Sequence, residues 1–223
     1  MIRTVMLAAL AAVAFSAQAQ NAGDPAKGKT YAETICVACH GLEGMSAQQP
    51  EVYPEGLPYL AGQGEDYLAK QLRDFQSGAR TTNAVMAGMA STVPPEDVIN
   101  VAAWYATQKH DTKLLPQTED ETKLALEPLD EAAMARGKQL WRAGDAARGI
   151  PACSGCHGQH AEGLPAQYPA LAGQYAPYLL HQLKFFASGV RNNDAESVMR
   201  DIAGRMSENE MKEAIGYAVQ LKP

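Results

Sequence analysis

The chain has 223 residues, 46% of them hydrophobic, so it can bury a core and suits one large domain or two small ones. It carries 25 acidic against 19 basic residues, a formal net charge of −6. Nucleic acid is therefore not an expected partner, because binding to phosphates needs a basic surface.

The first residues have the features of an export signal. Arg3 supplies a positive start, residues 5–15 are apolar, and AQA at 17–19 is a small-x-small cleavage site. An uncleaved anchor is the alternative, but the apolar run has about half of the roughly 20 residues that a spanning helix needs. We predict a signal peptide over residues 1–19, cleaved after about Ala19, and a protein that is periplasmic in a Gram-negative bacterium. Loss of Arg3 leaves a net charge near −7.

The first helix is expected to open at Asp24, a suitable N-cap, with Pro25 at its first position. It should run to the first cysteine of CVACH, residues 36–40, in which two cysteines are separated by two residues and a histidine follows.

Two more helices are expected in the first half. One covers residues 65–77, ends at Gly78 and places four apolar side chains on one face. The next opens at Pro94 and ends near Gln108. The four apolar residues are Tyr67, Leu68, Leu72 and Phe75.

Residues 110–130 have six acidic residues, two prolines and no counterpart elsewhere in the chain, which is typical of a linker. Its leucines need cover, so we expect it to lie over the surface. They are Leu114, Leu115, Leu124, Leu126 and Leu129.

The second half repeats the first. Residues 26–41 match 135–158, which has eight extra residues before the cysteines, and residues 57–80 match 168–191. The predicted signal peptide, first domain, linker and second domain are therefore residues 1–19, 20–109, 110–130 and 131–223.

Helices in the second half are expected to begin near Asp130, Ala176 and Ser207, with a capping box between Ser207 and Glu210. The motif returns as CSGCH at 153–157. No segment alternates with period two for long enough to indicate a sheet, so the predicted fold class is all-α.

All four cysteines lie in the two C-x-x-C-H motifs, which in an exported chain indicate covalent c-type haem attachment. The thiols bind two vinyl groups on one porphyrin edge, which places the next histidine under the iron. The alternatives are a thioredoxin-like disulfide, which lacks its βαβ setting here, and a zinc site, which the adjacent histidine does not suit. The cysteines are Cys36, Cys39, Cys153 and Cys156, and the histidines are His40 and His157.

The tandem motifs, each followed by LAGQ, a helix containing QL, and a methionine near MAGM or VMRDIAGRMS, resemble the dihaem cytochrome c4 family. The likeness covers residues 24–221. It implies two tandem class I cytochrome c domains, two covalently bound haem c groups, and periplasmic electron transport.

The second axial ligands are expected to be Met86 and Met199. Aligning the halves pairs Pro94 with Ser207, and each methionine stands eight residues upstream, where the family places its ligand. Of the competing methionines, Met89 and Met206 are interpreted as packing residues, since Met89 aligns with Ile202 and Met206 with Val93. The remaining competitors are Met45 and Met211.

Resemblance to class I cytochromes implies that the carbonyls of Pro58 and Pro169 accept a hydrogen bond from Nδ1 of the proximal histidines. Gly28 and Gly137 occupy matching helix positions, where we expect the last helix of each domain to cross closely.

The other histidines, His110, His160 and His181, have no counterpart in the other half and are predicted to be surface residues. His160 is also considered for contact near the second haem.

An electron carrier without bond chemistry fits the duplicated ligands best, whereas a dihaem peroxidase would need an open iron position and a distal acid or base. The alternative is the electron-accepting subunit of a flavoprotein dehydrogenase such as sulfide dehydrogenase. The implied partners are redox proteins: a cytochrome bc complex, a terminal oxidase or a flavoprotein. A peripheral membrane contact and the oligomeric state stay open.

Overall fold

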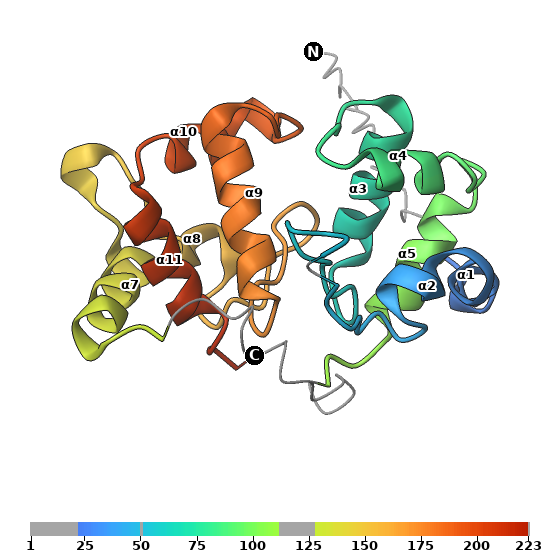
Figure 1. Ribbon diagram of the computed structural model, residues 1–223, viewed down its shortest axis with the longest axis horizontal. Helices are drawn as coiled ribbons and strands as arrows, with labels where there is room; N and C mark the ends of the chain where they lie inside the picture. The colour runs from blue at the N-terminus through green and yellow to red at the C-terminus, as the bar shows by residue number, and fades with distance from the viewer. Residues whose placement is uncertain (1–21, 50, 112–127, 223) are drawn as a thin grey trace, which may run out of the picture.

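The computed structural model describes residues 22–49, 51–111 and 128–222, which form two helical domains side by side (Figure 1). Within these ranges the secondary structure is helical, apart from two isolated bridges, Asp145–Ile150 and Leu164–Tyr168. The predicted all-α fold class is therefore confirmed. No helix in this part of the chain is long and apolar enough to cross a membrane. The predicted signal peptide and residues 112–127 of the predicted linker lie outside the described residues.

The helices of the first domain begin and end close to the predicted residues, except that the one predicted from Pro94 begins four residues later, at Val98. The Asp24 side chain accepts hydrogen bonds from the backbone of Ala26 and Lys27, and Gly78 ends the third helix with a left-handed φ of 75°. The helical segments are α1 (Pro25–Tyr31), the π-helical η1 (Ala32–Cys36), α2 (Val37–His40), α3 (Glu65–Ser77), α4 (Ala84–Ala90) and α5 (Val98–Ala106).

The second domain repeats this order. Ser207 and Glu210 form the predicted capping box at the start of the last helix. The extra residues before the second motif form a short turn, closed by two backbone hydrogen bonds between Asp145 and Ile150. The segments are α7 (Glu131–Ala143), η3 (Ala146–Arg148), α8 (Ser154–His157), α9 (Ala176–Ser188), η4 (Ala195–Ser197), α10 (Val198–Ala203) and α11 (Glu208–Ala218).

In each domain the first helix crosses the last at a glycine, as predicted. A Cβ on Gly28 would lie 1.9 Å from the carbonyl oxygen of Asn100 in α5, and one on Gly137 would lie 2.1 Å from that of Glu213 in α11. The backbones meet so closely that no side chain fits between them. These contacts set the distance of α1 from α5 and of α7 from α11.

Gly137→Ala is expected to destabilise the second domain by about 1–3 kcal/mol, because the added methyl group must push α7 and α11 apart. Chemical unfolding of the haem-containing protein measures this loss. Gly88→Ala is the matched control, since Gly88 lies in a helix and a Cβ there meets nothing within 4 Å. Equal stability of the two variants would contradict the close-crossing interpretation.

Two short helices, α4 and α10, were absent from the prediction, because each contains too few residues to show a helical period. In the second domain, η4 precedes α10, and both Glu196 and Ser197 have positive φ. The described end of the linker is covered as expected: Leu129 lies so close to Gly216 in α11 that a Cβ there would be 2.5 Å from its Cδ1.

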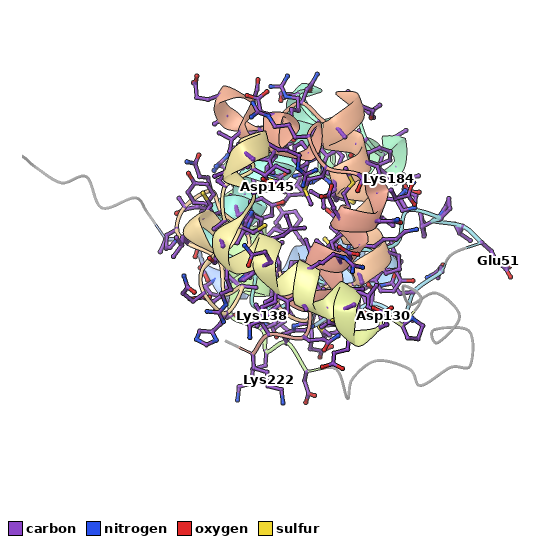
Figure 2. All side chains as sticks on the ribbon, turned by 90° about the vertical axis from the view of Figure 1, so that its left-hand side faces the viewer. Glu51, Asp130, Lys138, Asp145, Lys184 and Lys222 are labelled. Atoms are coloured by element: carbon purple, nitrogen blue, oxygen red, sulfur yellow. The ribbon has the colours of Figure 1, made fainter. Side chains whose placement is uncertain are left out.

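Helices α3 and α9 face each other across the domain boundary, with α5 outside the first and α11 outside the second (Figure 1). Charged side chains such as Lys138, Lys184 and Lys222 lie around the outside of the second domain (Figure 2). The two domains therefore meet between α3 and α9.

Candidate functional site

One continuous cavity extends from the first motif, across the domain boundary, to the second motif. Each domain contributes its C-x-x-C-H histidine and one methionine of the predicted ligand pair. Of the residues predicted to hold the cofactors, the wall contains Cys36, His40, Met86, Cys153, Cys156, His157 and Met199.

His40 and His157 are buried at the ends of one-turn helices, with 4% and 8% of their surfaces exposed. The Nδ1 atom of His40 lies 3.4 Å from the carbonyl oxygen of Pro58, and that of His157 lies 2.9 Å from the oxygen of Pro169. Since a carbonyl only accepts, Nδ1 carries the proton in both contacts, and Nε2 carries the lone pair that can bind a metal.

Burial lowers the pKa of His157 and lowers that of His40 to about 4, so both imidazoles are neutral at physiological pH. The Nε2 atom of His40 is buried and has no hydrogen-bond partner among the described residues. An orphaned buried nitrogen is costly unless a ligand takes its lone pair, which is what an iron bound there would do.

The four cysteines are not joined in disulfides. Burial raises the pKa of the Cys36 thiol and raises that of Cys153 to about 11. The Cys39 sulfur lies 3.5 Å from the Tyr53 hydroxyl. Among the described residues, no group of three or more His, Cys, Asp or Glu side chains is placed to hold a metal ion. Neither the disulfide alternative nor the zinc alternative gains support.

Met86 stands in α4, whose first turn is capped by the Asn83 side chain bonding to the Met86 backbone at 2.9 Å. Met199 stands at the start of α10, where Asp194 holds the backbone and guanidinium of Arg200. Both methionines line the cavity and are partly buried.

The competing methionines occupy different settings. Met45 and Met211 are core residues. Met89 is 38% exposed, so its interpretation as a packing residue was wrong, but it lies off the cavity wall. Met206 packs on the core and also lines the cavity, which makes it the sharper competitor of Met199.

The comparisons with known proteins agree with this geometry. The family described as Cytochrome c matches residues 25–109 and 134–222. Cytochrome c4 of Pseudomonas aeruginosa is 34% identical over 215 residues, 96% of each chain. The crystal structure of reduced recombinant cytochrome c4 from Pseudomonas stutzeri has a TM-score of 0.73 at 32% identity, covering 90% of this chain and 100% of that one.

The chain belongs to the cytochrome c4 family.

A third relative is named thiosulfate dehydrogenase electron acceptor, from Thiomonas intermedia. It is 38% identical over 208 residues, which cover 93% of this chain and 86% of that protein. Membership in the cytochrome c4 family establishes that this protein has two tandem cytochrome c domains, carries two haem c groups and transfers electrons.

Two buried arginines form the part of the site that the sequence analysis missed. Arg80 and Arg191 are each 5% exposed and line the cavity at the domain boundary. Arg80 donates to Gln182 and Tyr178 of α9, and Arg191 donates to Gln71 and Tyr67 of α3. The sequence repeat could have revealed them, because SGAR and SGVR end at these two arginines in matching positions of the two halves.

Among the described residues, neither guanidinium has a carboxylate as a hydrogen-bond partner. Burial alone would raise the pKa of Tyr178, but the positive charges of Arg80 and Arg191 outweigh it and lower that pKa. Two buried positive charges need negatively charged groups nearby to offset the cost of burial. Haem carries carboxylates, and a haem bound in this cavity would supply that negative charge, so the residues present at the boundary fit the cofactor.

The remaining histidines stand apart from the iron ligands. His110 and His160 are exposed, as predicted, and neither His160 nor His181 is part of the cavity wall. His181 is half-buried, with its ring 6.0 Å from that of Phe185. His110 contacts both domains, lying 5.6 Å from the Tyr59 ring and against Gly173.

Proposed function

We propose that this protein is a periplasmic electron carrier in which His40 and Met86 bind one iron and His157 and Met199 bind the other. The observation that carries the proposal is that both histidine and methionine pairs line one cavity. Attachment through Cys36 with Cys39, and Cys153 with Cys156, completes the site. Bound haem supplies the one-electron iron couple.

The chain's own residues would set the reduction potential of that couple and exclude water from the iron. Each histidine is buried and neutral, with Nδ1 directed at a backbone carbonyl, so Nε2 is a fixed donor. A thioether as the second ligand favours ferrous iron and hence a high potential. If the histidine and the methionine of each domain bind its iron, no position would be left where a substrate could coordinate.

The cavity also supports transfer between the domains. Its lining residues come from both domains, and at the boundary Arg80 and Arg191 each bond to both of them. We propose that an electron entering one domain passes to the other across this shared region. The protein then exchanges two electrons per chain.

For the donor, the relatives favour a dehydrogenase of a sulfur compound. One relative at 38% identity is named an electron acceptor of thiosulfate dehydrogenase. We propose that this chain accepts electrons from a periplasmic enzyme of that kind and passes them toward a terminal oxidase. Stopped-flow reduction by a purified thiosulfate dehydrogenase and by a flavoprotein sulfide dehydrogenase compares this donor with the flavoprotein alternative.

Six-coordinate haems should make the reduced protein bind carbon monoxide poorly and show negligible peroxidase turnover. The rate of electron exchange with a small redox protein should depend on salt concentration, as expected for docking steered by surface charge. Optical titration with carbon monoxide checks the first point. Rapid, stoichiometric binding to either haem would reject the carrier and favour a dihaem enzyme.

A further inference from the structure

The glutamine that ends each LAGQ sequence forms two hydrogen bonds with the backbone of the other domain. Gln63 donates from Nε2 to the carbonyl oxygen of Ala170 at 3.0 Å, and its Oε1 accepts from the Ala170 backbone nitrogen at 2.8 Å. Ala170 directly follows Pro169, whose carbonyl oxygen accepts the hydrogen bond from Nδ1 of His157. A first-domain side chain therefore holds the backbone beside the second proximal histidine.

The relation is reciprocal. Gln174 accepts from the Tyr59 backbone nitrogen and donates to the Tyr59 carbonyl oxygen, both at 2.8 Å. Tyr59 directly follows Pro58, whose carbonyl lies at Nδ1 of His40. Each domain thus contacts the segment that orients the histidine of the other.

Neither glutamine can easily turn away. Gln63 and Gln174 are 7% and 9% exposed. Their Oε1 atoms also accept from the next backbone nitrogen in their own domain, that of Gly64 at 3.0 Å and of Tyr175 at 2.9 Å. Three hydrogen bonds on each amide leave one arrangement that satisfies the buried groups.

The other side of each proline is held within its own domain. In the first, Gln48 pairs with both backbone groups of Leu57, at 2.9 and 2.8 Å. In the second, Leu164 and Tyr168 exchange two backbone hydrogen bonds. The carbonyl that receives each histidine therefore lies between one support from its own domain and one from the other.

We propose that Gln63 and Gln174 are positioning residues that make the proximal hydrogen bond, and hence the reduction potential, of each haem depend on the other domain. The strength of the Nδ1–H···O=C bond sets how strongly the imidazole donates to iron, and a stronger donor favours ferric iron. Loosening the support weakens that bond and raises the potential. The inference rests on the proposed ligation by His40 and His157.

The test uses Gln63→Leu and Gln174→Leu in the exported dihaem protein. Leucine keeps similar bulk but pairs with neither backbone group. Gln63→Leu should raise the potential of the second-domain haem and speed exchange of the His157 Nδ1 proton, seen by NMR. We expect roughly fivefold faster exchange or more, as when a hydrogen bond of ordinary net strength is lost. Gln174→Leu should do the same for His40 and the first-domain haem.

Two further variants separate positioning from loosened packing. Gln48→Leu should act on His40 alone, since its contact lies within the first domain. Gln76→Leu removes a glutamine that bonds to the carbonyls of Ala90 and Val93, away from both prolines. It should leave both Nδ1 exchange rates unchanged.

Equal responses of the two haems, or a response confined to the domain that carries the substitution, would overturn the proposal. So would unchanged exchange in both glutamine variants. If the unsubstituted protein held two haems but lacked the shifted Nδ1 signals of His40 and His157, histidine ligation itself would be wrong. That outcome is distinct from normal signals that ignore the substitutions.

Discussion

Met86→His is expected to lower the potential of the first haem by on the order of 0.1 V, a fraction of the ~0.8 V range over which axial ligands set haem potentials. Imidazole stabilises ferric iron more than a thioether does. The weak sulfur-to-iron absorption band should fall by half, while the second haem keeps its potential. Met199→His should produce the mirror result, and spectroelectrochemical titration resolves the two haems.

The controls are Met89→Leu and Met206→Leu. Met206 is the more demanding of the two because it lines the same cavity as Met199. Both variants should keep the full absorption band. Loss of the band in Met206→Leu would show that Met206, rather than Met199, is the ligand and that our alignment of the two halves is shifted.

Substitution of both Cys153 and Cys156 by serine is expected to remove one haem from each chain. Intact mass should fall by one haem relative to the unsubstituted protein, which carries two, and acid-acetone should leave one haem attached. The second domain should also lose stability, because its share of an apolar cavity then has no contents. The first domain should keep its haem.

The mirror pair, Cys36→Ser with Cys39→Ser, should remove the other haem. A mass equal to that of the unsubstituted protein in either variant would disprove attachment at that motif. An unsubstituted chain whose mass matches two disulfides and no haem would disprove both.

Local signals were sufficient for most of the helices. Asp24, Gly78 and the Ser207–Glu210 pair act through contacts within a few residues, so their effects on helix ends are visible in the chain itself. The crossing at Gly28 and Gly137 was predictable for another reason: duplication showed the same unfavourable residue twice. Short α4 and α10 escaped because a segment of six or seven residues shows too little of the 3.6-residue period.

The sequence by itself determined the two attachment motifs, the duplication, and the resemblance to a dihaem family, because covalent chemistry requires fixed residues at fixed spacing. Only the tertiary structure decided what lies between the domains. Arg80 and Arg191 look like ordinary surface cations in the sequence, yet both are buried at the boundary. Gln63 and Gln174 end the repeated LAGQ sequence, yet their partners lie more than a hundred residues away. Partners of buried polar groups depend on how whole domains pack, and no local pattern encodes that packing.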